Sequence, residues 1–180
     1  ISQYSGLNNL SYADADAKEF KQILINYANY KSFEIEAESK NITIFSEGEN
    51  IQIEHDSDRI SQVITNLIRN SINAIQSNKG EIKISVEDNP KEVIVHVKDD
   101  GVGIPQDKQK DLFKKFYQVD ATLTRETGGS GLGLAICKGI GTNHGGESSV
   151  KSSPNQGATF SLTLPKQDSG EQPRSPIGTT

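Results

Sequence analysis

The stretch SQVITNLIRNSINAI, residues 61–75, combines two patterns on one predicted helix. Apolar side chains recur at helical spacing and form one face; they are Ile64, Leu67, Ile68, Ile72 and Ile75. Three asparagines, Asn66, Asn70 and Asn73, follow a stripe roughly opposite that face. Asparagine is a poor helix former because its amide competes for backbone hydrogen bonds. The stripe therefore indicates a polar site, although taken alone it is also what a solvated helix surface would show.

The composition limits the class of protein. With 180 residues, of which 33% are hydrophobic, the chain suits one domain with extensions and a buried core. A net charge of −5 without a large Lys/Arg block argues against a nucleic-acid binder. No apolar run approaches membrane-spanning length, so we expect no membrane contact. The single cysteine, Cys137, fits a reducing, cytoplasmic compartment and is expected to be a small buried side chain. The chain begins at Ile1 and lacks Met, so we expect a piece of a longer protein.

Periodicity and turn residues predict the order of the elements. Four helices are expected, and the first spans about 17–35. The second begins at a cap formed by Asp56, Ser57 or Asp58 and ends near 77. The third lies near 106–116 and the fourth within 131–146. Strands are expected at 41–45 and 51–55 around a turn at Gly48, at 80–88 and 92–99 as a hairpin, and at 158–165. The domain is predicted to span 17–165, with a linker at 1–16 and a disordered tail at 166–180.

This order predicts an α+β fold. Strands in antiparallel pairs with helices between them favour a two-layer sandwich, with one mixed, mostly antiparallel sheet and helices on one face. A doubly wound parallel sheet is disfavoured, because the 80–99 hairpin has no room for a crossover helix.

Two glycine-rich stretches follow the asparagine helix. In DDGVGIP, residues 99–105, an acidic residue ends a strand, and Asp99 could accept a hydrogen bond from an exocyclic amine such as that of adenine. In GGSGLGLAI, residues 128–136, glycines run directly into an apolar helix, whose free N–H groups and dipole suit an anion. A simple turn and a glycine hinge are the respective alternatives. Neither the P-loop pattern nor the Rossmann fingerprint is matched.

The order of these motifs resembles the catalytic ATP-binding domain of sensor histidine kinases, in the superfamily shared with gyrase, Hsp90 and MutL. DRISQVITNLIRNSINAI looks like the family's N box and VKDDGVGIP like its G1 box. LFKKFYQVD, residues 112–120, looks like the F box, and TGGSGLGLAICKGI like the G2 box. The resemblance covers about residues 20–165 and implies this fold, ATP and Mg²⁺ as ligands, and a mobile lid over the nucleotide.

The resemblance also implies roles for individual residues. Asn70 would bind Mg²⁺, Asn66 would be a polar contact near the phosphates, and Asp99 would bind the adenine amine. Gly101 and Gly103 would make room for the ring, and Phe113 and Phe116 would anchor the lid as packing residues together with Tyr117. The resemblance implies Asn66, Asn70 and Arg125 as the catalytic residues. The remaining expected contacts to the nucleotide are Asn73, Ile104, Phe113, Lys115, Tyr117, Gly129, Gly131, Leu132 and Gly133. Where Asn73 stands the family often has Lys; Arg69 or Lys115 are the candidates to replace that phosphate contact.

One substitution at the expected site favours transfer over hydrolysis. The superfamily's ATPases carry a Glu base four residues before the magnesium asparagine, where this chain has Asn66. The resemblance thus implies transfer of the γ-phosphate to a histidine on an upstream dimeric helical hairpin, with a response regulator as later partner. His55, His96 and His144 do not match the phosphoacceptor pattern. A nucleotide sensor without transfer activity and a serine kinase of the anti-sigma-factor type remain the alternatives.

Overall fold

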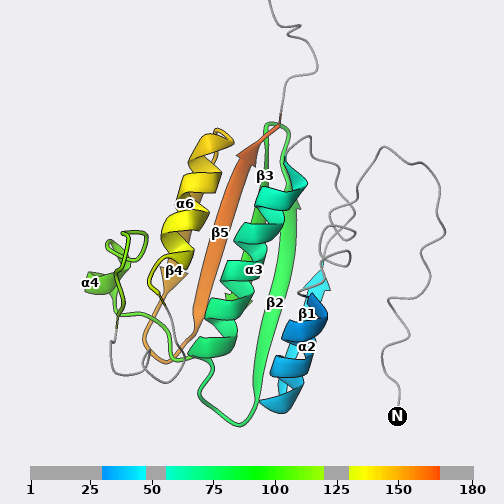
Figure 1. Cartoon of the computed structure of the whole chain (residues 1–180), viewed down its shortest axis with the longest axis vertical. Coiled ribbons are helices and arrows are strands. Elements are labelled where there is room, and N and C mark those ends of the chain that lie inside the picture. The colour runs from blue at the N-terminus through cyan, green and yellow to red at the C-terminus, as the bar shows by residue number, and fades with distance from the viewer. Residues whose placement is uncertain (1–29, 48–55, 120–129, 167–180) are drawn as a thin grey trace, which may run out of the picture.

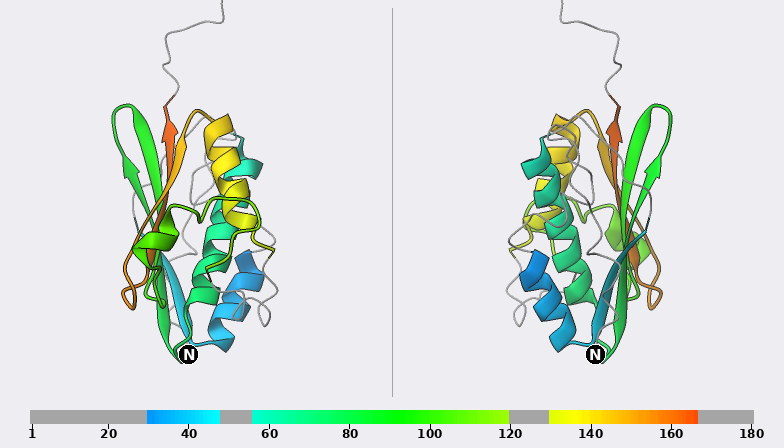
Figure 2. Two further views of the ribbon diagram at one scale, coloured as in Figure 1. Left: turned by 90° about the vertical axis from the view of Figure 1, so that its left-hand side faces the viewer. Right: turned by 90° about the vertical axis from the view of Figure 1, so that its right-hand side faces the viewer.

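The chain folds as one mixed sheet with helices packed on one face (Figures 1 and 2). The computed structural model describes residues 30–47, 56–119 and 130–166. The helices are α2 (Tyr30–Ser39), α3 (Ser57–Ala74), α4 (Gln106–Gln109) and α6 (Gly133–Asn143). The strands are β1 (Ile42–Glu47), β2 (Gly80–Asp88), β3 (Glu92–Asp99), β4 (Glu147–Ser152) and β5 (Ala158–Pro165). The predicted α+β sandwich is therefore confirmed.

The sheet order is β1-β2-β3-β5-β4, and only the pairing of β1 with β2 is parallel. The predicted hairpin of β2 and β3 is confirmed, with Val86 opposite Val95. Strand β1 runs parallel to β2 in the register Ile44 to Ile82, a pairing that the sequence did not predict. Its expected partner at 51–55 and the Gly48 turn lie outside the described residues.

Two expectations need correction. Strand β4 (ESSVKS) was not predicted, because Val150 is its only apolar residue and it lies at the sheet edge. The helix expected near 106–116 is only four residues long and continues as turns. Helix α6 begins at Gly133 and ends at Asn143, inside the predicted range. The predicted linker at 1–16 and nearly all of the predicted tail lie outside the described residues.

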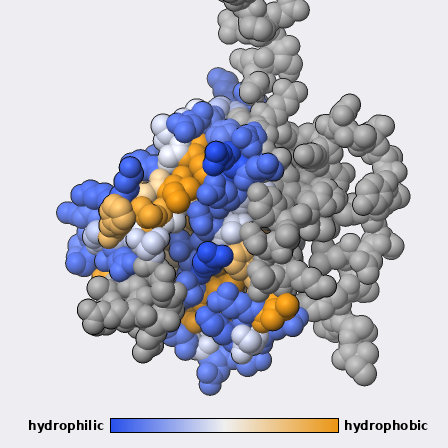
Figure 3. Space-filling model, in the orientation of Figure 1, coloured by the Kyte–Doolittle hydropathy of each residue, from blue (hydrophilic) through white to orange (hydrophobic). Residues whose placement is uncertain are grey.

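The core lies between the sheet and α3. Alternate residues of β3, namely Val93, Val95 and Val97, are fully buried, and so are Ile60, Ile64, Ile68 and Ile72 of α3. Asp56 begins α3 as its N-cap, since its Oδ1 accepts hydrogen bonds from the backbone N–H groups of Asp58 and Arg59, both at 3.1 Å. One of the three predicted caps is thus confirmed. On the helix-bearing side, Figure 3 shows a largely hydrophilic surface with an apolar strip in the region of α6.

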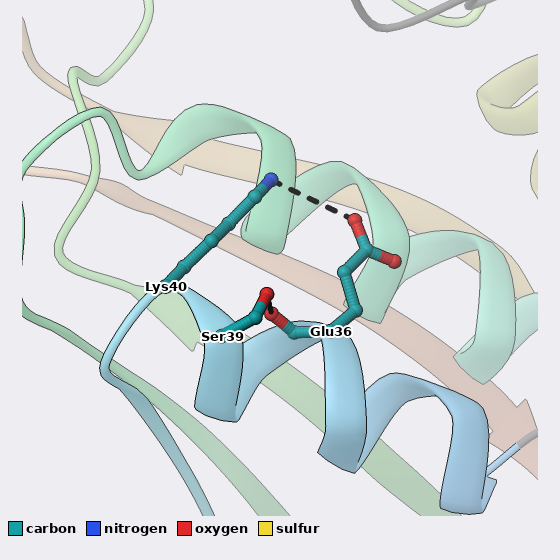
Figure 4. Close-up of polar contacts among 3 residues, drawn as sticks. All are labelled: Glu36, Ser39 and Lys40. Carbon is teal, nitrogen blue, oxygen red and sulfur yellow. Dashed lines mark hydrogen bonds and ion pairs between the residues drawn. The ribbon is translucent and has the colours of Figure 1, made fainter.

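Helix α2 covers the β1 edge of the core and extends beyond the predicted end near residue 35. At its end the Ser39 hydroxyl donates to the Glu36 carbonyl at 2.7 Å, and Lys40 pairs with the Glu36 carboxylate at 3.6 Å (Figure 4). Asn41 then takes a left-handed conformation with φ of 54°, which turns the chain into β1. The Arg69 guanidinium of α3 lies 5.4 Å from the centre of the buried Phe33 ring of α2. None of the described helices is long and apolar enough to cross a membrane.

Two glycines inside α6 have different surroundings. A Cβ at Gly141 would lie 3.1 Å from both Leu162 Cδ1 and Ser148 Oγ, so this glycine lets the helix approach the sheet closely. A Cβ at Gly139 would meet nothing within 4 Å. Only Gly141 is therefore required by packing.

We predict that Gly139→Ala raises the free energy of unfolding by about 1 kcal/mol, because alanine lowers the backbone entropy cost of the helix. Gly141→Ala is the matched control and should give no gain, because its new methyl group crowds the sheet. Urea denaturation of both variants measures the difference. Equal stabilisation by the two substitutions would contradict the packing difference.

Candidate functional site

Asp99 is a buried carboxylate at the end of β3. Its side chain is 2% exposed, and its two oxygens have different partners. Oδ1 accepts hydrogen bonds from the backbone N–H groups of Gly101 at 3.0 Å and Ala158 at 3.2 Å. Oδ2 accepts one from the Ser71 hydroxyl at 3.1 Å. Burial raises the pKa of Asp99, the three donors oppose that rise, and the neighbouring charge of Asp100 adds to it.

The next residue, Asp100, has a different role. It is exposed, and its Oδ1 accepts a hydrogen bond from the backbone N–H of Glu81 at 2.9 Å, near the start of β2. Asp100 thus fastens the loop after β3 to the neighbouring strand. Of the two adjacent acidic residues, only Asp99 faces the interior.

The glycines after Asp99 allow close contacts between backbones. A Cβ at Gly101 would lie 2.6 Å from the Ala74 carbonyl oxygen, and one at Gly103 would lie 1.9 Å from the Ser153 carbonyl oxygen. Gly103 also has φ of 68°, a conformation that other residues rarely adopt. Both positions therefore need glycine for contacts within the protein. Making room for a nucleotide ring remains a prediction for them.

Two polar side chains that the sequence did not single out hold this loop in place. The Ser152 hydroxyl accepts a hydrogen bond from the Ile104 backbone N–H at 2.8 Å. The Gln109 amide donates to the carbonyl oxygens of Ile104 and Ser152, both at 2.8 Å. Ile104 itself is half-buried and packs against the core. Since β4 was not predicted, no sequence pattern placed Ser152 beside this loop.

The asparagine stripe faces the start of α6. Asn66 lies against Gly133, where a Cβ would be 3.8 Å from Asn66 Cγ. The Asn66 side-chain nitrogen is buried and makes no hydrogen bond of standard geometry among the described residues, although the Cys137 thiol, a weak acceptor, lies near it. Asn70 and Asn73 follow along the same helix and are half-buried. The stripe is therefore no ordinary solvated surface, although it lies opposite the apolar face.

The start of α6 offers backbone donors beside Asn66. Leu132, its N-cap residue, makes no side-chain capping bond. The first N–H groups of a helix have no partner within the helix, and the dipole favours negative charge there. A buried amide without a standard hydrogen bond and an uncapped helix start thus lie side by side, which is an arrangement suited to an anion.

Cys137 is the buried side chain that the sequence predicted. It is 1% exposed, and its thiol donates to the Val63 carbonyl across 3.7 Å. Burial raises its pKa to about 12, and the Asn66 amide only partly opposes that rise by stabilising the thiolate. The thiol therefore packs α6 against α3 and stays protonated at neutral pH.

The predicted F box and G2 box meet through their backbones. The Phe116 N–H donates to the Gly131 carbonyl at 2.9 Å, and a Cβ at Gly131 would lie 2.8 Å from the Phe116 carbonyl carbon. This contact joins the two ends of the segment predicted to be a lid. Arg125 and Gly129, two of the predicted site residues, lie in that segment outside the described residues.

The side chains of the F box divide between core and surface. Phe113 packs against the core, as predicted, and Tyr117 is half-buried. The expectation that Phe116 packs was wrong: its side chain is 73% exposed, because its positive φ of 64° reverses the backbone at the Gly131 contact. Lys115 is exposed, and nothing in the described contacts brings it to Asn66 or Asp99.

Comparisons with known proteins agree with this geometry. Residues 55–168 match the family model described as histidine kinase-, DNA gyrase B-, and HSP90-like ATPase. The sensor protein SrrB of Staphylococcus aureus is 44% identical over 114 residues, 63% of this chain and 19% of SrrB. The solved catalytic domain of histidine kinase ThkA is 32% identical with a TM-score of 0.67, covering 81% of this chain and 93% of that domain. ThkA in complex with the response regulator TrrA is 30% identical with a TM-score of 0.65, covering 82% of this chain and 40% of that one.

The chain thus belongs to the histidine kinase-, DNA gyrase B- and HSP90-like ATPase family, as a catalytic domain of the sensor histidine kinase type. The resemblance seen in the sequence is confirmed. The chain spans about a fifth of the length of SrrB, one of the curated relatives that it matches.

We predict that Asp99→Asn stabilises the fold at pH 7 by about 1 kcal/mol, because it removes a buried charge while the neutral amide keeps a carbonyl oxygen for backbone donors. The raised pKa means that the folded state holds the Asp99 proton to higher pH than the unfolded state does. In the unsubstituted chain, Asp99 therefore contributes most to the free energy of unfolding below the pKa that it has in the unfolded state. This contribution falls as the pH rises through the pKa that it has in the folded state.

The advantage of the variant should consequently shrink as the pH is lowered toward the unfolded pKa of aspartate. Urea denaturation of both proteins between pH 4 and pH 8 measures it. A constant difference over this range would contradict the raised pKa.

Proposed function

We propose that this domain binds Mg·ATP between α3, the end of β3 and the start of α6. The observation that carries the proposal is the buried Asn66 amide, which lacks a standard hydrogen bond among the described residues, beside the uncapped start of α6. These donors suit phosphate oxygens. The buried Asp99 carboxylate, linked to α3 through Ser71, suits the exocyclic amine of adenine.

Other residues complete the proposed site. Gly131, Leu132 and Gly133 would shape the backbone around the phosphates, with Gly129, Arg125 and Lys115 contributing from the lid. Asn73 stands at the position where the family often has a lysine that contacts phosphate, and its side chain is half-buried. Arg69 is a poor replacement, because its guanidinium stacks on Phe33 toward α2.

The proposed metal ligand is Asn70. Mg²⁺ prefers hard oxygen ligands and in nucleotide sites takes several of them from phosphates and water. A neutral amide oxygen adds a ligand without repelling the triphosphate. Within the described residues, no group of three or more His, Cys, Asp and Glu side chains is placed to hold a metal ion. Bound there, the ion would neutralise charge on the phosphates.

The reaction we propose is transfer of the γ-phosphoryl group to a histidine of a separate helical dimerisation domain. The bond between the γ-phosphorus and the bridging oxygen breaks, a bond from the unprotonated imidazole nitrogen to phosphorus forms, ADP leaves, and the proton is lost from the other ring nitrogen. Positioning and charge neutralisation supply most of the catalysis in such transfers. Asn66 supports transfer over hydrolysis, because an amide cannot take a proton from water.

Partners of the parent protein are likewise proposals. ThkA has been crystallised with the response regulator TrrA, and the similarity of its catalytic domain supports a receiver domain as the later phosphate acceptor here. The proposed parent is a homodimer, formed through the domain that carries the histidine.

We predict that Asn70→Ala weakens ATP binding at least tenfold in the presence of Mg²⁺ and changes it little in EDTA, because only the metal-dependent contact is removed. Calorimetric titration of the 180-residue chain measures both conditions. Asn78→Ala is the matched control, since Asn78 is an exposed asparagine beyond the end of α3. Absence of saturable ATP binding by the parent chain would overturn the proposed function.

A second measurement separates the proposed kinase from its alternatives. Joined to the helical hairpin of its parent protein, the domain should produce acid-labile, base-stable phosphate on histidine from ATP. Binding without any transfer would favour a nucleotide sensor, and acid-stable phosphate on serine would favour a serine kinase.

A further inference from the structure

Ser71 connects the asparagine helix directly to the proposed base contact. It follows Asn70 on α3, its side chain is fully buried, and its hydroxyl donates to Asp99 Oδ2 at 3.1 Å. A serine inside a helix commonly bonds back to a carbonyl one turn earlier. This hydroxyl instead reaches a residue 28 positions away, on a strand.

The two oxygens of Asp99 are held unequally. Each carboxylate oxygen offers about two lone-pair positions. Oδ1 already accepts from two backbone N–H groups, those of Gly101 and Ala158. Oδ2 accepts from Ser71 alone within the described residues, which leaves one acceptor position open. A ligand donor that reaches Asp99 would therefore bind at Oδ2, beside the Ser71 hydroxyl.

We propose that Ser71 is a positioning residue for the nucleotide base, which holds the Asp99 carboxylate so that the open acceptor position of Oδ2 faces the exocyclic amine. This inference rests on the proposed function, because it takes Asp99 as the adenine contact. Two bonds that converge on Oδ1 leave the carboxylate free to pivot about that oxygen. The hydrogen bond from Ser71 to the other oxygen prevents this rotation, so less conformational entropy is lost when the base binds.

The same helix supplies a matched control. Ser61 is also a buried serine of α3, with 4% exposure, but its hydroxyl has no hydrogen-bond partner among the described residues. Replacing Ser61 removes a buried hydroxyl without touching Asp99. A comparison of the two serines thus separates the hydrogen bond to Asp99 from the general effect of a polar atom inside α3.

The test is calorimetric titration of the 180-residue chain with two nucleotides in Mg²⁺. ATP carries the exocyclic amine, and purine riboside triphosphate has the same phosphates and ring system without it. Ser71→Ala should weaken ATP binding about tenfold, equal to ~1.4 kcal/mol, and leave binding of purine riboside triphosphate unchanged. Ser71→Thr, which keeps the hydroxyl, should restore most of the ATP affinity. Ser61→Ala should change neither affinity.

The outcomes distinguish this inference from the proposed function. Equal losses for both nucleotides would mean that Ser71 only supports the fold, and unchanged or tighter ATP binding would mean that its hydroxyl does not position Asp99. Either result overturns the inference and leaves the proposed function standing. Failure of the unsubstituted 180-residue chain to bind ATP overturns both the inference and the proposed function. Ser71→Cys replaces the hydroxyl by a somewhat larger group that is only a weak donor, so its ATP-specific loss tests the inference independently of the alanine variant.

Discussion

The carboxylate of Asp99 is the interaction on which the rest of the site depends. It lies at 2% exposure at the end of a central strand, where an ionised group is costly unless it is hydrogen-bonded. Its three donors come from different elements: Gly101 from the following loop, Ala158 from β5, and Ser71 from α3. One side chain thereby links the sheet, the helix layer and the loop. Burial still raises its pKa, so ionisation of Asp99 costs the folded state stability.

Glycines make this arrangement possible because they let backbones meet without a side chain between them. Gly101 contacts the carbonyl of Ala74, whose oxygen also accepts the Val102 N–H at 3.0 Å. Gly157, with φ of 73°, lies against the Asp99 carbonyl from the turn between β4 and β5. The loop after β3 is thus fixed between the end of α3 and an edge hairpin. A rigid support of this kind is what a binding residue requires if it is to keep its orientation.

The sequence predicted those parts of the fold in which local pattern and packing agree. The β2–β3 hairpin and α3 have strong periodicity and a good cap in Asp56, and the structure contains them as expected. Strand β4 has a single apolar residue, so local periodicity did not predict it. Strand β1 was predicted, but its parallel pairing was not, because its partner β2 lies some 40 residues away. Asp99 followed from its place before two glycines. Ser71, Ser152 and Gln109 did not, because each is an ordinary polar residue whose partner is distant in sequence.

The contact between Phe116 and Gly131 holds together the two ends of the segment predicted to be a lid. Its hydrogen bond joins the two ends of the segment that contains the predicted contacts Arg125 and Gly129. Because the bond lies between backbone groups, it does not use the side chain of either residue. Gly131 has φ of 67° and no room for a Cβ beside Phe116, so this contact depends on a glycine two residues before α6. The same glycine thereby connects Phe116 to the helix start where Asn66 and Gly133 meet.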